Sequence, residues 1–437
     1  MESKKKVPTL NKVAYGIGTG GGCIFSQIAA AFLLNYYTDT VLIGAGAIAT
    51  MFLVCRIFDG VTDLVMGGIV DKTSSRLGKA RPWLIASAPL TLLGIVLLMN
   101  VPSGFGDAGK LAYAYITYIF MSCIVYTIYG ISNTALLPLM THDKNESTML
   151  ATFSALGNNI IGLLAGSLIT PLVLNFGWKT SSVILGGAAC VLILISGLLN
   201  KEMESMEEGR QRASVPMSEQ LPATLKNRYF WLLLLLGAFS LIMNANAIGA
   251  QIFYCNMVLK NPMFMSVLMT AGQLPGIFIL FLMPAISKKW NKKTFLLMGA
   301  VLIIVGFAIT GLAGENTTMI VVGTVIRSLG VGPILSAVFA LVPDVVEYGN
   351  WKFGISSEGL ISSAQSIGSK IGIGVGSALT GWILAAVGYN PVAEPTQAVI
   401  NAVKFDYTWM GVILGIIILV IVLLLDVEKY ADQYNRD

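Results

Sequence analysis

The stretch RIFDGVTDLVMGG, residues 56–68, puts one arginine and two aspartates inside an apolar run from about residue 41 to residue 70. A charged side chain at the centre of a bilayer costs roughly 2.5–3.5 kcal/mol, so such residues usually face a cavity or a partner. Asp59 and Asp63 are four residues apart and Arg56 precedes Asp59 by three, which places all three on one helix face. Two carboxylates so close repel each other, so either one takes up a proton or a cation lies between them. The alternative is a structural salt bridge between Arg56 and Asp59, which accounts for only one of the two aspartates.

The composition of the whole chain indicates an integral membrane protein. Of its 437 residues 55% are hydrophobic and 12% are charged, and the mean hydropathy is +0.76. Soluble domains are about 45–50% apolar and about 25% charged. We therefore interpret the net charge of +5 by position along the chain and expect no nucleic-acid partner. The five cysteines stand singly in apolar segments, which predicts neither a disulfide framework nor a structural metal site.

Hydropathy predicts twelve membrane-spanning helices, because each span needs roughly 20 mostly apolar residues. The predicted spans are about 13–37, 41–70, 82–101, 111–140, 149–175, 180–199, 229–258, 263–286, 294–313, 317–343, 357–388 and 407–426. A polar, charged segment divides them into an N-terminal half (1–199), a cytoplasmic linker (200–228) and a C-terminal half (229–437). Most of the 28 Lys and Arg residues then fall in loops on one side, which predicts that both termini are cytoplasmic.

A lysine in the eleventh predicted span is the second charge anomaly. Lys370 lies in AQSIGSKIGIGVGSALTGW, about halfway along the span, among glycines that allow close helix contacts. A carboxylate elsewhere in the bundle is its natural partner, and Asp59 and Asp63 are the only aspartates or glutamates that we place mid-span. The alternative is a lysine whose ammonium reaches to the membrane surface.

Six motifs in order give the chain a family resemblance. They are LNYYTD (34–39), RIFDGVTDLVMGGIVD, SRLGKARPW, YTIYGISNTALLP, DVVEYGNWKFGISSEG and SIGSKIG with VGYNP. With these motifs the chain resembles the glycoside–pentoside–hexuronide:cation symporters of the major facilitator superfamily over nearly its whole length. The resemblance implies an all-α membrane protein with twelve transmembrane helices in two six-helix bundles around a central cavity.

The resemblance also implies roles for individual residues. Asp59 and Asp63 match the family's cation-site aspartates, Thr127 matches a threonine near the cation, and Thr62 stands where sodium-using members have an asparagine. Lys370 matches a lysine beside both the cation and the sugar sites, with Gln365 and Ser366 shortly before it.

The galactoside-binding residues of the family are replaced in this chain. Cys23 and Gly130 stand where the galactoside carriers have aspartates, Thr134 replaces a tryptophan and Ala155 an arginine. This pattern favours a β-glycoside, pentoside or hexuronide over an α-galactoside. The polar and aromatic residues left to bind a sugar, each of which can instead form a helix–helix hydrogen bond, are Tyr126, Tyr129, Asn133, Asn158, Asn159, Asn244, Asn246, Gln251, Gln273 and Gln365.

Charged residues near the cytoplasmic ends of the spans are candidates for gating. Asp71, in a loop typical of the superfamily, is predicted to latch the two halves; the alternative is a solvated basic loop. The full set of gating candidates is Arg56, Asp71, Asp344, Glu347 and Glu358.

Together these features predict a secondary active transporter that couples sugar or glycoside uptake to H⁺ or Na⁺. The alternatives are an uncoupled facilitator or exporter, a lipid carrier of the related branch, and a membrane-embedded enzyme, for which no catalytic constellation is evident. We expect no cofactor beyond the co-transported ion, and a monomer that spans the inner or plasma membrane of a bacterium.

Overall fold

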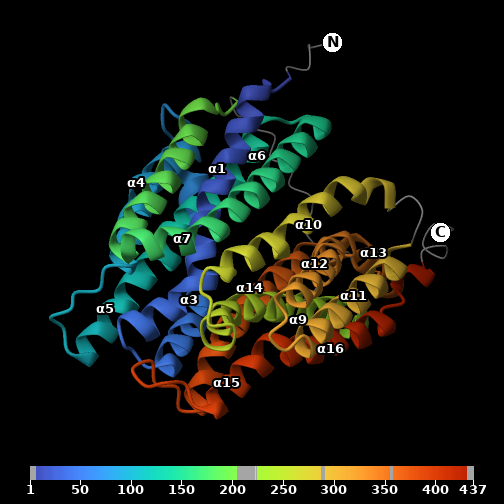
Figure 1. Ribbon diagram of the computed structural model, residues 1–437. Helices are drawn as coiled ribbons and strands as arrows, with labels where there is room; N and C mark the ends of the chain where they lie inside the picture. Colours follow the sequence, from blue (N-terminus) through green and yellow to red (C-terminus); the bar gives the residue numbers. More distant parts are fainter. Residues whose placement is uncertain (1–5, 204–221, 223, 287–290, 355–357, 431–437) are drawn as a thin grey trace, which may run out of the picture. The chain divides into compact units, whose positions relative to one another are not determined.

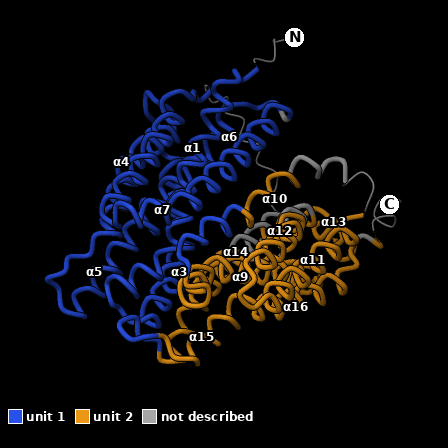
Figure 2. Tube along the Cα trace, viewed as in Figure 1, with its two compact units in different colours: residues 1–207, 261–270, 389–394 blue, residues 208–260, 271–388, 395–437 orange. Residues whose placement is uncertain are grey.

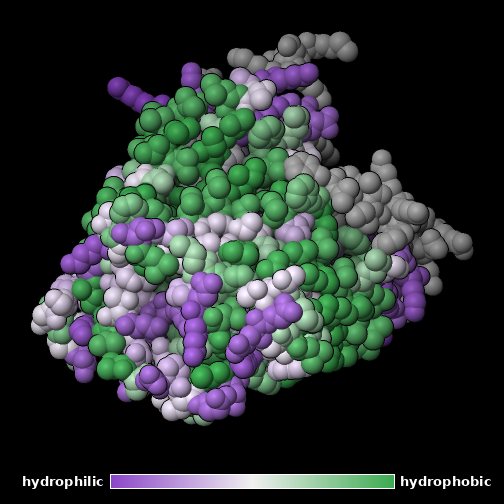
Figure 3. Space-filling model, in the orientation of Figure 1, coloured by the Kyte–Doolittle hydropathy of each residue, from purple (hydrophilic) through white to green (hydrophobic). Residues whose placement is uncertain are grey.

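Long apolar helices make up nearly all of the described chain. The computed structural model describes residues 6–203, 222, 224–286, 291–354 and 358–430, and these contain no strand. Nine helices within these ranges are long and apolar enough to cross a membrane. Many large apolar side chains are exposed, and hydrophobic residues cover α4, α7, α11 and α16 in Figure 3. Such surfaces suit lipid rather than water, so the all-α membrane class is confirmed, whereas the count of twelve spans stays a prediction.

The chain divides into two compact units, shown separately coloured in Figure 2. Unit 1 contains residues 1–207, 261–270 and 389–394, and unit 2 contains 208–260, 271–388 and 395–437. Two short segments of the predicted C-terminal half thus group with unit 1. The predicted linker lies largely outside the described residues.

Unit 1 holds five long helical runs (Figure 1). They are the run of α1 (Thr9–Gln27), η1 (Ile28–Phe32), α2 (Leu33–Asn35) and η2 (Tyr36–Thr40), then α3 (Ala45–Lys72), α4 (Arg81–Leu98), the run of α5 (Asp107–Ile119), η3 (Phe120–Tyr126) and α6 (Thr127–Met140), and α7 (Lys144–Leu199). Helix α7 covers two predicted spans and is interrupted at Gly177, whose φ of 72° is accessible mainly to glycine. That break lies between the predicted spans 149–175 and 180–199.

Unit 2 holds the remaining helices (Figure 1). They are α9 (Arg228–Phe253) with η4 (Tyr254–Val258), α10 (Phe264–Ile286), which begins in unit 1, α11 (Lys292–Leu312), α12 (Thr317–Ala340), α13 (Val342–Phe353), α14 (Glu358–Ala386), the run of α15 (Gln397–Lys404), η5 (Phe405–Trp409) and α16 (Met410–Leu424), and η6 (Val427–Tyr430). Its core contains Leu296, Ile303, Ile334 and Ile418, contributed by α11, α12 and α16.

Paired glycines let α1 and α7 approach closely. A Cβ atom at Gly157 would overlap the carbonyl group of Gly16, so neither helix could keep its place. Small residues at helix contacts allow close van der Waals packing, which is the main attraction between helices in lipid.

We expect Gly157→Ala to destabilise the protein by about 1–3 kcal/mol, the usual cost of overpacking. Gly187→Ala is the matched control on the same helix, because a Cβ there meets no atom within 4 Å; the better helix propensity of alanine should make it neutral or stabilising. Thermal midpoints of the purified variants test this, and equal midpoints would contradict the described contact.

Candidate functional site

Helix α3 holds its three mid-span charges on one side. Nη1 of Arg56 lies 3.0 Å from Oδ2 of Asp59, and Asp59 is only 5% exposed. On a different face of the same helix Leu64 is 80% exposed. The salt bridge that the sequence allowed between neighbouring turns is therefore formed, and it buries a carboxylate within the helix bundle of unit 1.

Hydroxyl groups from the neighbouring helical run lie against the two carboxylates. Thr127, the first residue of α6, donates to Oδ1 of Asp63 at 3.2 Å, and its oxygen lies 3.3 Å from the hydroxyl oxygen of Thr62. Ser122 of η3 lies 3.5 Å from Oδ1 of Asp59. Carboxylate and hydroxyl oxygens are ligands for hard cations, and carboxylates can also carry a proton. The structure thus brings together all four residues proposed from the sequence for the cation, and adds Ser122, which the motifs did not single out.

Lys370 lies half-buried on α14, in unit 2. A Cβ at Gly372 or Gly376 would meet backbone carbonyls of α9, so these glycines form the contact face between α14 and α9. Lys370 is two residues from Gly368 and from Gly372, which turns it about half a helical circumference away from that face.

Two of the candidate sugar residues of unit 1, Asn133 and Tyr126, are hydrogen-bonded to side chains of α1. Asn133 donates to the hydroxyl of Thr19 at 3.1 Å, and Ser154 donates to the same hydroxyl at 3.0 Å. Tyr126 shares a hydrogen bond of 2.8 Å with Ser26. Thr19, which joins α1, α6 and α7, is not among the residues predicted from the sequence. A threonine within a glycine-rich helix is its only signal there.

Other candidate substrate-binding residues lie on α1, α7 and α14. Cys23 is buried in α1, Asn158 is exposed on α7, and the Asn159 amide donates to a carbonyl one turn earlier in its own helix. The side chains of Gln365 and Ser366 lie outside the described part of the structure.

The gating candidates are divided between the two units. Asp71 is exposed at the end of α3, and Glu347 is exposed on α13. Asp344 forms an ion pair of 2.7 Å with Lys292, inside unit 2. The side chain of Glu358 lies outside the described residues. A gating role for these residues stays a prediction.

Two further ion pairs join helix ends, one within each unit. Lys12 of α1 lies 2.8 Å from Glu146 at the start of α7. Lys293 of α11 pairs with Asp426 beyond α16, and this hydrogen-bonded ammonium holds the pKa of the Asp426 carboxyl below its usual range.

Asp39 and Asp406 also lie within helical runs that are long and apolar enough to cross a membrane, Asp39 near the end of its run. The first helical run continues to Thr40 and so includes Asp39, and the last begins at Gln397 and so includes Asp406. The predicted ends at residues 37 and 407 followed the apolar stretches alone, whereas the helices continue through polar residues. Asp406 is only 2% exposed.

Asp39 joins the first helical run to the chain after α14. The Tyr389 hydroxyl donates to Oδ1 of Asp39 at 2.8 Å, and Asn35 donates to Oδ2 at 2.6 Å. Burial, reinforced by Asp39, raises the pKa of Tyr389 above its usual range, which keeps the phenol protonated and able to donate.

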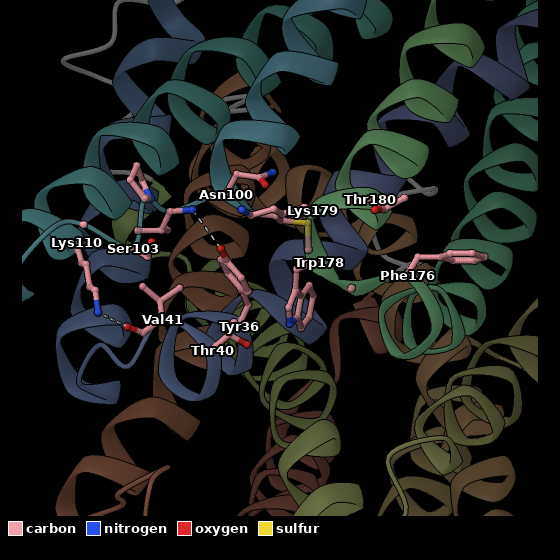
Figure 4. A pocket seen from close by; sticks show the side chains of 15 residues that line it. Tyr36, Thr40, Val41, Asn100, Ser103, Lys110, Phe176, Trp178, Lys179 and Thr180 are labelled. Carbon is pink, nitrogen blue, oxygen red and sulfur yellow. Dashed lines mark hydrogen bonds between the residues drawn. The ribbon is translucent and has the colours of Figure 1, made fainter.

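A cavity of about 830 Å³ opens beside the end of this run (Figure 4). Its wall includes the rings of Tyr36 and Trp178, whose centroids are 5.0 Å apart and whose planes are tilted by 57°. Lys110 lies in the wall and donates to the carbonyl of Val41 at 3.1 Å. Aromatic rings beside a lysine can contact polar ligands. The candidate cation-binding residues of α3, Asp59 and Asp63, are not among the residues that line this cavity.

Apolar helices with a carboxylate–hydroxyl cluster inside them define a multi-pass membrane transporter. The sequence matches the model of the MFS/sugar transport protein family over residues 14–429, and the chain belongs to this family.

Individual relatives agree with this assignment. The chain is 28% identical to the isoprimeverose transporter of Lactiplantibacillus pentosus, over 94% of this chain and 87% of that protein. It is 28% identical to the glucuronide carrier protein homolog of Escherichia coli (strain K12), over 90% of this chain and 87% of that protein. Among solved structures it resembles a bacterial homolog of the human lysosomal transporter Spinster, with a TM-score of 0.68 at 12% identity, over 95% of both chains. The predicted family and fold class are thereby confirmed.

Proposed function

We propose that this protein is a secondary active transporter that moves a sugar or glycoside together with H⁺ or Na⁺. The observation that carries the proposal is the cluster of Asp59, Asp63, Thr62 and Thr127 between α3 and α6 of a member of this family. The relatives named as an isoprimeverose transporter and a glucuronide carrier support a sugar as the substrate.

The charge on α3 suggests how ion and sugar movement are coupled. With both carboxylates ionised, Arg56, Asp59 and Asp63 together carry one net negative charge. Binding one H⁺ or Na⁺ makes the group neutral, which lowers the cost of moving it through low-dielectric surroundings. The loaded site can then cross between its outward- and inward-facing states more easily than the empty site.

The substrate class follows from the replaced galactoside residues. Cys23 is buried and Gly130 offers no side chain, so neither supplies the carboxylate that the resemblance assigns to galactosyl binding. We propose a β-glycoside, a pentoside or a hexuronide, and Lys370 is the residue suited to meet a substrate carboxylate.

The proposal also covers the membrane topology and the partners of the protein. The distribution of Lys and Arg supports both termini in the cytoplasm of a bacterium. We propose a monomeric carrier rather than an enzyme, which uses no cofactor besides the co-transported ion and binds no nucleic acid.

Thermal stability of the purified protein with a panel of sugars tests the substrate class. A ligand at 100 times its Kd stabilises the folded state by about 2.7 kcal/mol. We expect a hexuronide, a pentoside or a β-glycoside to raise the thermal midpoint and melibiose to leave it unchanged. Stabilisation by melibiose alone would overturn the proposed class, and uptake driven by an imposed H⁺ or Na⁺ gradient identifies the ion.

A further inference from the structure

A second carboxylic acid is enclosed in unit 2, away from α3 in the sequence. Asp406 lies in the π-helical turn η5 and is 2% exposed. Its Oδ1 atom has no hydrogen-bond partner among the described residues. Single π-helical turns within α-helices occur frequently at functional sites. An ionisable residue within a membrane span is energetically costly, so such residues usually have a function.

The groups that contact Asp406 are neutral. Its carboxyl group lies beside the neutral side chains of Thr380 of α14 and Asn246 of α9. The Asn246 amide also donates to the backbone carbonyl of Asp406 at 3.3 Å, and Thr380 donates to Oδ1 of Asn246 at 3.4 Å. This geometry fixes the carboxyl group between two helices without supplying a positive charge.

The nearest buried cation is engaged elsewhere. Arg327 of α12 is 8% exposed and donates to the Tyr407 hydroxyl at 3.3 Å. Its guanidinium carbon also lies 4.8 Å from the ring centroid of Phe307 and 5.2 Å from that of Tyr407. In the described part of the chain no ion pair is formed between Arg327 and Asp406.

Few other ionisable groups come from the elements around η5. Helix α11 contributes Phe307 and Thr310, and α14 contributes Thr380, all of them neutral. The ionisable groups on the neighbouring segments include Tyr254 and Cys255 of η4, Glu315 before α12, Arg327 of α12, Lys404 of α15 and Tyr407 of η5 itself. Further along the same helices lie Arg228 and Tyr229 at the start of α9, Lys292 and Lys293 at the start of α11, and Lys370 on α14. A negative charge on Asp406 is therefore not compensated by a direct ion pair in this arrangement.

A proton is the ligand that such a site accepts. An ionised carboxylate enclosed without a cation costs several kcal/mol, and a proton removes the charge. A metal ion would need several free oxygen ligands, whereas Asn246 and Thr380 are already hydrogen-bonded to each other. We propose that Asp406 is a proton-binding site in the C-terminal half, separate from Asp59 and Asp63, and that it takes up and releases a proton during transport. The role of this site in transport rests on the proposed function, whereas proton binding itself does not.

Infrared difference spectroscopy of the purified full-length protein tests proton binding directly. We expect a protonated-carboxyl band that is lost when the pH is raised, and that is absent at every pH from Asp406→Asn. Thr380→Val keeps the acid but removes the hydroxyl group beside it, so it should retain the band at a shifted frequency. A spectrum of Asp406→Asn equal to that of the unmodified protein at every pH would overturn the proposal. So would an Asp406 band that persists at every pH at which the protein is folded, because the group would then be permanently neutral.

Sugar counterflow in de-energised vesicles gives the second readout. Its pH profile should lose one titration step in Asp406→Asn and keep that step in Asp107→Asn, an exposed aspartate at the start of α5. An unchanged profile in Asp406→Asn would overturn the role in transport. If the unmodified protein moves no sugar, the proposed function fails, and the infrared titration still decides whether Asp406 binds and releases a proton.

Discussion

Asp63→Asn is expected to abolish the accumulation of sugar against a gradient while leaving exchange of sugar across the membrane. Asparagine keeps the shape of the side chain and can still bond to Thr127, which lies 3.2 Å from the Asp63 carboxylate. It cannot bind a proton and offers no negative charge to a sodium ion. Arg56 and Asp59 would then be neutral together without an ion, so binding of the ion would no longer lower the cost of moving the site. Sugar movement would therefore lose its link to the ion gradient.

Radiolabelled uptake in energised vesicles, beside counterflow in de-energised vesicles, measures the two activities separately. Asp107→Asn is the matched control, because it removes an exposed aspartate at the start of α5 and should concentrate sugar as the unmodified protein does. If Asp63→Asn also concentrates sugar normally, Asp63 lies outside the coupling site and the proposed mechanism fails.

The second large effect is expected from Asp59→Asn, which should reduce both coupling and the yield of folded protein. Asp59 pairs with Arg56 at 3.0 Å, and the side chain of Arg56 is 20% exposed. Removing one partner of a buried ion pair costs roughly 3–5 kcal/mol, because the other charge loses its compensation. Partial exposure of Arg56 places the expected cost near the lower figure.

The double variant Arg56→Gln/Asp59→Asn separates the structural from the coupling role. Removing both charges leaves no buried charge without its counter-ion, so the yield should recover even though coupling does not. Yields and thermal midpoints of the single and double variants, with the same two vesicle assays, test this. A double variant as unstable as Asp59→Asn would show that the stability loss has another origin.

The sequence predicted those features that depend on local spacing. The i, i+3 and i, i+4 positions of Arg56, Asp59 and Asp63 fix their common helix face, and the structure places them there. The hydropathy break near residue 177 predicted the boundary between two spans, and Gly177 interrupts α7 at that place.

Features that depend on contacts between distant segments were not predictable in the same way. A hydropathy threshold ends a span where polar residues begin, so it left Asp406 outside a helix that continues through it. The role of Thr19 depends on two side chains more than 100 residues away, Asn133 and Ser154. Nothing in the residues around Thr19 encodes these partners.

Gly130 has a consequence for how this fold changes over time. A Cβ atom at this position would meet no atom within 4 Å, although the family resemblance places a substrate-binding aspartate there in the galactoside carriers. A new side chain at residue 130 would therefore displace none of its neighbours. Mutation can alter recognition at this position without compensating repacking, so sugar preference is free to drift between descendants that keep the same helical framework.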